Sequence, residues 1–209
     1  MKRVAIGVHL RRDDIEPLAA AVPAGDVFFS AVEVADDQPL GDRELLLRVA
    51  QVRAALLERA TFIAVRYGYT FAQEVEARHL ARWKETLETN RGNVEMTLKV
   101  AATSPRARPD RHAFTSGADY LRALQEATQA AAADPRFRAE TERLIIPHAV
   151  RHRWIHRDEK SLELAALVAR EGVDAVRAAG EQLRRACPEV PFLLSGPWPL
   201  EVFADADHE

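Results

Sequence analysis

Short runs of β-favouring residues alternate along this chain with segments of helical periodicity, in two successive groups. In the first group, strands are predicted over Val4–Val8 and Val27–Val34, and a short helix is predicted between them over Asp13–Ala21. A polar loop then leads to a helix that ends near Arg59, which Asp42 is expected to cap. A β-rich run, Thr61–Tyr67, closes the group. This order favours an α+β protein over a helical bundle.

The second group begins with a helix predicted over Phe71–Glu88, in which His79 lies on the apolar row and is expected to be a core histidine. A strand over Val94–Val100 follows, with alternate residues apolar. Its other face carries Glu95 and Lys99, which are expected to pair with each other. The remaining predicted elements are a loop over 101–112, helices over 116–133 and 172–186, a helix from Pro135 that Pro147 interrupts, a segment at 161–169 that suits strand or helix, and a strand over 191–195.

These elements predict two domains, residues 1–68 and residues 69–209, the second ending in a short acidic tail that should fray. At 209 residues and 47% hydrophobic composition, the chain can bury a core and is not expected to be disordered. Its formal charge of −3 argues against a protein built to coat nucleic acid. The apolar runs are too short for a signal peptide or a spanning helix, which predicts a cytoplasmic protein with no membrane segment.

Sulfur chemistry is limited by the single cysteine, Cys187. One cysteine cannot form an intramolecular disulfide, and no thiol cluster offers a zinc site. We expect Cys187 to be a half-buried apolar residue near a helix end rather than a nucleophile, because no histidine or carboxylate partner lies nearby in the sequence.

Three histidines spaced four residues apart, His148, His152 and His156, would share one face of a helix. Three histidine ligands are typical of catalytic zinc. However, the three would extend about 12 Å along a helix, so only adjacent pairs can share an ion. The arginines between them would repel a cation. We therefore predict a solvated, pH-sensitive basic face, and keep a metal-binding protein or metalloenzyme as the alternative.

The same region carries Trp154 and follows three arginines, Arg136, Arg138 and Arg143. A nucleic-acid surface combines basic residues with aromatic ones, but no known nucleic-acid module accompanies this segment. A solvated helix face with one anchoring aromatic is the favoured prediction. The sequence also lacks glycine-rich phosphate loops and a nucleophile elbow, so nothing in it indicates catalysis, a cofactor or a resident metal.

Four stretches in order resemble the GvpF/GvpL family of gas vesicle proteins. They are Phe62–Thr70, similar to the family's "LP-x-R-F-G-T" strand and turn; Asn93–Val100, similar to "V-E-W-x-V-K-V"; Arg157–Val168, similar to "R-E-E-x-L-L-N-A-A-Y-L-V"; and Leu194–Pro199, similar to the ending "L-T-G-P-W-P-P-Y-S-F". The stretch Ser116–Leu121 is also similar to the family's "S-G-x-x-Y-L" helix start. The resemblance spans about residues 62–203, and the ending departs from the family after Pro199.

This resemblance implies two α+β domains, the second a modified ferredoxin-like (split βαβ) sheet with extra helices, and it makes 161–169 a strand. It implies a non-catalytic accessory or structural protein of gas vesicle assembly, located in the cytoplasm with the gas vesicle. Its expected partners are the main shell protein and other accessory proteins. Trp198 and Phe203 are the candidate interface residues, since aromatics dominate interface energetics. The alternative for Trp198, which we favour, is packing of the C-terminal strand onto the core.

Overall fold

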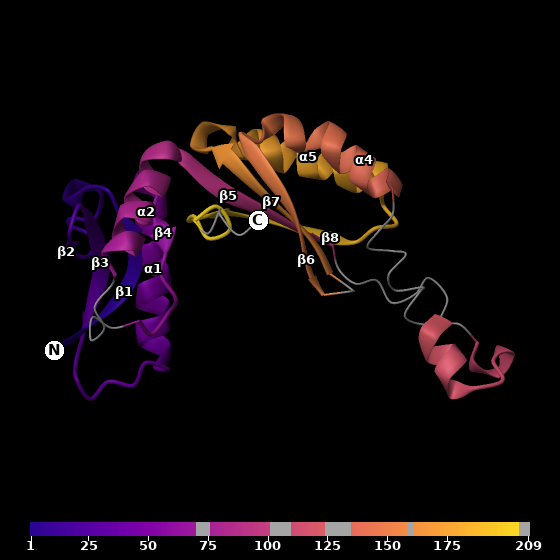
Figure 1. The fold of residues 1–209 in the computed structure, drawn as a ribbon, viewed down its shortest axis with the longest axis horizontal. Coiled ribbons are helices and arrows are strands. Elements are labelled where there is room, and N and C mark those ends of the chain that lie inside the picture. The colour runs from indigo at the N-terminus through magenta and orange to yellow at the C-terminus, as the bar shows by residue number, and fades with distance from the viewer. Residues whose placement is uncertain (70–75, 101–109, 124–134, 159–160, 205–209) are drawn as a thin grey trace. The chain divides into compact units, whose positions relative to one another are not determined.

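The computed structural model describes residues 1–69, 76–100, 110–123, 135–158 and 161–204. The chain forms two compact units. The first contains residues 1–94 and the chain from residue 197 onward, and the second contains residues 95–196. Each unit combines helices with a four-stranded sheet (Figure 1), which confirms the α+β prediction.

The sheet of the first unit has the strand order β2-β3-β1-β4 and is antiparallel. Its elements are β1 (Lys2–His9), β2 (Ala20–Ala24), β3 (Val27–Val34), β4 (Ile63–Ala64) and the helices α1 (Arg43–Arg59) and α2 (Ala77–Thr89). Successive residues of β1, from Val4 to Ile6, are almost fully buried, so both faces of this strand are covered. On one face, the indole of Trp83 in α2 meets the ring of Phe29 edge to face at 6.0 Å.

The helix α1 begins where the sequence predicts. The Asp42 side chain accepts a hydrogen bond of 2.9 Å from the backbone N–H of Leu45. This bond, and a second one from the Gln38 amide, hold the pKa of Asp42 below its ordinary value. Leu45, Val49 and Leu56, which repeat along one side of α1, are buried.

Two predictions for this unit are wrong. The segment predicted as a helix over 13–21 contains only a 3₁₀ turn, η1 (Arg12–Asp14), followed by the edge strand β2. Pro17 explains the difference, because proline lacks the N–H that would close the first turn of the helix and clashes with the preceding turn. The β-rich run 61–67 forms only the two-residue strand β4.

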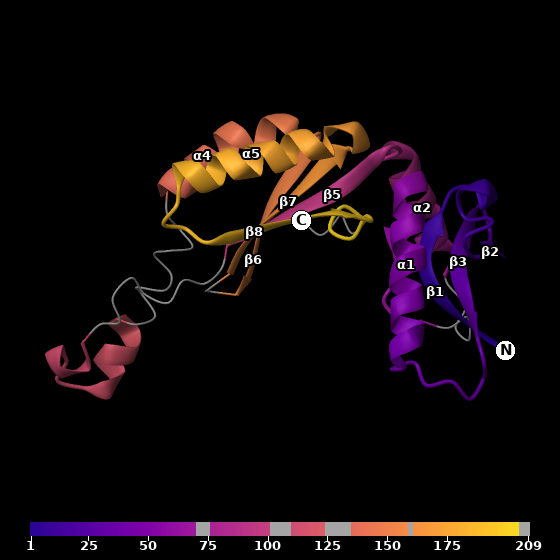
Figure 2. The same ribbon diagram turned by 180° about the vertical axis from the view of Figure 1, so that it is seen from behind.

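The sheet of the second unit has the strand order β6-β7-β5-β8. Its elements are β5 (Asn93–Val100), η2 (Arg111–Ala113), a helical segment at 117–123, α4 (Pro135–Leu144), η3 (Ile146–His148), β6 (Arg151–Asp158), β7 (Ser161–Ala169), η4 (Arg170–Gly172), α5 (Val173–Ala186) and β8 (Phe192–Trp198). Both views of the ribbon place α4 and α5 on the same face of this sheet (Figure 2). Phe137 of α4 packs on Phe192 with ring centroids 5.6 Å apart.

Most predicted elements of this unit are present. The ambiguous segment 161–169 is the strand β7, as the family resemblance implies, and α4, α5 and β8 lie where helices and a strand are predicted. Cys187 follows α5 and is buried, with 1% of its surface exposed. The predictions for residues 71–75, 101–109, 124–133 and 205–209 lie outside the described residues.

The polar face of β5 differs from the prediction. Glu95 and Thr97 are buried, with 2% and 7% of their surfaces exposed. Lys99 forms its ion pair with Glu163 of β7 at 3.6 Å, and not with Glu95. The low exposure of Glu95 and Thr97 shows that the second face of β5 is covered as well. Alternation along a strand gives the direction of each side chain but not its depth.

The two units divide the chain at residues 94/95 and 196/197, whereas the sequence placed a boundary between residues 68 and 69. The helix α2 lies in the first unit because it packs on the first sheet, and Lys84 at its surface pairs with Asp26 at 2.8 Å. The C-terminal segment returns to the same sheet. Leu200 forms a parallel bridge with Ile63, and its backbone N–H donates to the carbonyl of Phe62 at 2.9 Å.

Candidate functional site

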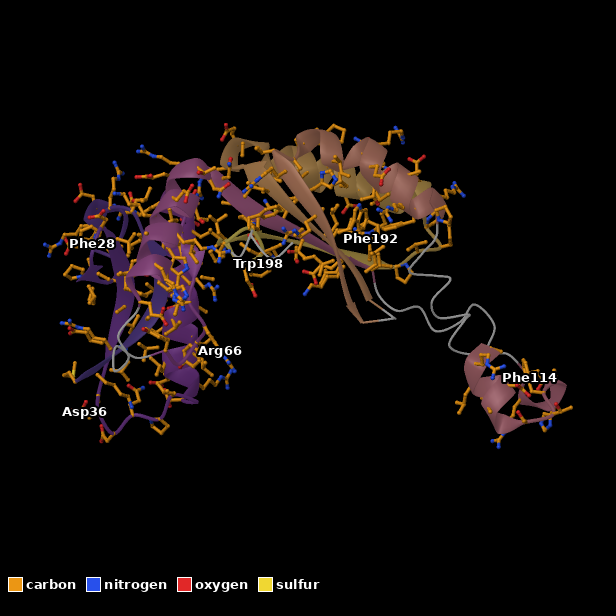
Figure 3. All side chains as sticks on the ribbon, in the orientation of Figure 1. Phe28, Asp36, Arg66, Phe114, Phe192 and Trp198 are labelled. Atoms are coloured by element: carbon orange, nitrogen blue, oxygen red, sulfur yellow. The ribbon has the colours of Figure 1, made fainter. Side chains whose placement is uncertain are left out.

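The two candidate interface residues lie on either side of Leu200 and have opposite environments. Trp198 ends β8, and 47% of its surface is exposed (Figure 3). Phe203 is buried, with 4% exposed. Phe203 is therefore a core residue and cannot contact a partner in the folded chain. Of the two, only Trp198 presents an aromatic surface to solvent.

Leu200 and Phe203 anchor the C-terminal segment. Leu200 is fully buried and is held by backbone hydrogen bonds to the strand around Ile63. Trp198 is about half exposed, so the fully buried anchors of this segment are Leu200 and Phe203. Gly196 allows the chain to bend just before Trp198, and we call this bend the Gly196 corner. Its φ is +125°, and a Cβ there would lie 2.7 Å from the sulfur of Met96 and 2.9 Å from the carbonyl oxygen of Glu95. Only glycine fits this position without strain.

The histidine series does not lie on a helix. His148 ends the 3₁₀ helix η3, whereas His152 and His156 belong to the strand β6. Four residues along a strand span about 13 Å, which is too far for His152 and His156 to share one ion. No cluster of three or more His, Cys, Asp or Glu residues that suits a metal is found in the described part of the chain. The predicted helix face is wrong because this segment pairs with β7 over its whole length.

The basic residues near Trp154 are engaged within the unit. The Arg138 guanidinium lies 5.3 Å from the centroid of the Trp154 ring and also pairs with Glu142. Arg143 pairs with Glu140 at 2.6 Å. Trp154 thus lies beneath α4, and its face toward Arg138 is not open to stack on a nucleic-acid base.

Among the histidine side chains that the structure describes, the buried one is His9, which no motif in the sequence marks. His79 is exposed, whereas His9 has no exposed surface and stacks on Phe62 at 4.8 Å. Its Nε2 lies 3.0 Å from Oγ of Ser30, and that hydroxyl donates to the carbonyl oxygen of Gly7 at 3.3 Å. The available signal was its position in the apolar run 4–10.

These contacts fix the protonation of His9. Because the Ser30 proton is directed to Gly7, the Nε2 of His9 is the donor, and Nδ1 is the unprotonated nitrogen. Nδ1 is buried without a hydrogen-bond partner. Burial lowers the pKa of His9 from 6.5 to about 4, against a smaller opposing effect of Asp14. A neutral imidazole in this position serves packing of the first sheet.

The described residues therefore offer an exposed aromatic at Trp198 and no group of three or more metal-ligating side chains. No helix among them is long and apolar enough to cross a membrane. The family model described as "Gas vesicle synthesis protein GvpL/GvpF" matches residues 16–204. This chain belongs to the GvpL/GvpF family. The resemblance carried by the four sequence stretches is thereby confirmed, and it extends into the N-terminal third of this GvpL/GvpF chain.

Solved structures agree with this GvpL/GvpF membership at the level of the fold. The chain is similar to the crystal structure of the gas vesicle protein GvpF from Anabaena sp. PCC7120, with a TM-score of 0.70, 13% identity and 99% of each chain covered. It is also similar to that of GvpF from Microcystis aeruginosa, with a TM-score of 0.72, 10% identity, and 98% of this chain and 99% of that chain covered. No curated protein sequence matches at a significant level.

Proposed function

We propose that this protein is a non-catalytic accessory or structural component of gas vesicle assembly. It acts in the cytoplasm and at the gas vesicle by binding the main shell protein, together with other accessory proteins. The observation that carries the proposal is the family match, which covers nearly the whole described chain.

Trp198 is the residue proposed to contact the shell protein. Indole surfaces contribute strongly when they become buried in an interface, because a large rigid apolar area leaves water at little conformational cost. Trp198 has the required exposure of 47%, and its strand direction is set by the Gly196 corner before it and by the Leu200 anchor after it. The backbone that carries Trp198 is therefore already fixed before a partner binds.

The element order of the second unit supports a finer proposal for the fold. From β5 to β8 the chain runs strand, helix, strand, strand, helix, strand, and the sheet order is β6-β7-β5-β8. A split βαβ arrangement has this order of elements. We assign the second unit as a modified ferredoxin-like domain, with the helical segment at 117–123 as an addition. The chain is thus proposed to contain two domains.

The experiment is a pull-down of the shell protein with the full chain, with Trp198→Ala and with Leu47→Ala. Leu47 is the matched control, because it is apolar and 54% exposed but lies on α1. We expect Trp198→Ala to weaken retention at least tenfold and Leu47→Ala to leave it unchanged. No retention by the unmodified chain, together with intact vesicles after deletion of its gene, would overturn the function. Full retention by Trp198→Ala would overturn only the choice of residue.

A further inference from the structure

The edges of the two sheets differ in how they are protected. In the first sheet, β2 is five residues long and contains Pro23, and the short strand β4 is bridged by Leu200. In the second sheet, β8 contains Gly196 and Pro197, whereas β6 has eight residues and neither glycine nor proline. Short length and proline are the usual means of blocking pairing at an edge. In the part of the chain that the structure describes, β6 is the longest edge strand without them.

Among the strands that the structure describes, β6 has one neighbour in its sheet, β7. An edge strand directs alternate N–H and C=O groups away from the sheet, where they remain available to another strand. The register with β7 is regular from Arg151 to His156, and the irregularity lies between His156 and Asp158, next to the hairpin end. The five residues from Arg151 to Ile155 thus form a straight pairing edge.

This edge is positively charged. Arg151 and His152 are exposed, and Arg153 is half-buried. The register places Arg151 opposite Leu167 and Arg153 opposite Ala165. Arg153 makes no ion pair with any residue within the described ranges. Of the β7 side chains described, the one carboxylate is Glu163, and it pairs with Lys99.

The charge also selects the kind of strand that can pair. If a second copy added its own β6 in an antiparallel ladder centred on His152, Arg151 of one copy would face Arg153 of the other, and like charges directly opposite each other are destabilising. The edge therefore disfavours its own copy. A strand with carboxylates opposite Arg151 and Arg153 would instead form pairs of opposite charge, which stabilise a ladder. Because these arginines are two residues apart, both lie on one face, so the carboxylates must also alternate.

We propose that the edge of β6 binds an extended acidic segment of another protein by strand addition. The segment supplies main-chain hydrogen bonds to β6 and an acid–x–acid pattern that faces Arg151 and Arg153. This inference rests on the sheet order, the strand register and the charges. It does not depend on the shell-protein contact proposed for Trp198, and either can fail without the other.

The test uses the full chain and a fluorescent eight-residue peptide of alternating Glu and Val. Binding is measured by anisotropy, and amide hydrogen exchange of β6 is followed with and without the peptide. Two charge reversals are compared: Arg153→Glu on β6, and Arg185→Glu on the exposed side of α5 as a matched control in the same unit. Arg153→Gln removes the charge without reversing it, which covers the case in which the reversal disturbs folding.

We expect the peptide to bind, to slow exchange of the β6 amides, and to bind about tenfold more weakly to Arg153→Glu than to Arg185→Glu. Arg153→Gln should weaken binding less than Arg153→Glu does. The proposal is overturned by no binding at low salt, by equal loss in the two reversals, or by equal binding of a backbone N-methylated peptide. It is also overturned if single-stranded RNA binds with the same Arg153 dependence and no protection of β6.

Discussion

Replacement of His9 by Gln should remove most of the acid sensitivity of the first unit. The imidazole is fully buried, donates through Nε2 to Ser30, and has no acceptor or donor at Nδ1. Protonation would place a second N–H and a charge at Nδ1 where no group can receive them. Glutamine cannot titrate in this range, but its amide N–H can reach Ser30 as Nε2 does. His9→Gln thus removes the titration of the side chain but keeps its hydrogen bond to Ser30.

The magnitude follows from the two pKa values. In the folded chain burial lowers the pKa of His9 from 6.5 to about 4. The unfolded chain therefore binds the proton first as the pH falls, and the free energy of unfolding decreases between about pH 6.5 and pH 4. The full contribution is present above pH 6.5 and is lost below pH 4. The total loss is about 3 kcal/mol, of which about 2 kcal/mol should be lost by pH 5.

The assay is urea unfolding at about pH 7.5 and about pH 5, followed by hydrogen exchange of peptides from β1, which report on the first unit alone. His79→Gln is the control, because His79 is exposed and its loss should leave the pH dependence intact. The difference in unfolding free energy between the two pH values should be about 2 kcal/mol smaller in His9→Gln than in the unmodified chain. An unchanged difference would refute the assignment of His9 as the buried titrating group.

Three further substitutions test the packing described above, each by the free energy of unfolding. Gly196→Ala should destabilise by about 2 kcal/mol or more, because its Cβ would meet the sulfur of Met96 at a positive φ; a neutral effect would contradict the corner geometry. Asp42→Ala should lose about 1 kcal/mol of helix capping, and Asp42→Asn much less, so equal losses would argue against the cap. Phe203→Ala should lose about 3 kcal/mol or more as a core deletion, whereas Trp198→Ala should lose under about 1 kcal/mol, and the reverse order would contradict their burial.

Local signals in the sequence were sufficient for α1 and α5. A capping aspartate at Asp42 and an apolar stripe that repeats every three or four residues depend only on neighbouring residues, and both appear in the structure. The same reasoning failed at β6. A spacing of four residues between histidines is compatible with one face of a helix and equally with one face of a strand. Pairing with β7 decides between them, and no feature of that segment alone reports it.

The candidate site was predicted in part. The Gly-Pro-Trp-Pro ending pointed to the C-terminal corner, and Trp198 is exposed there. Sequence could not separate Trp198 from Phe203, because both are aromatics in a short segment without periodicity. Their depths depend on the bridge between Leu200 and Ile63, which joins positions more than a hundred residues apart. His9 was missed for the same reason: its burial depends on Ser30 and Phe62, which lie on other strands.

The bridge between Leu200 and Ile63 sets an order on how the chain can mature during synthesis. Residues 95–196 leave the ribosome before Leu200 does, so the second unit is complete while the first still lacks its last core residues. Until then, the carbonyl of Phe62 and the N–H of Ala64 lack the hydrogen bonds that they form with Leu200 in the folded chain. Domains usually fold from the N-terminus as they emerge. In this protein the first unit can form its backbone bonds to Leu200 only after residues 95–196 have been synthesised.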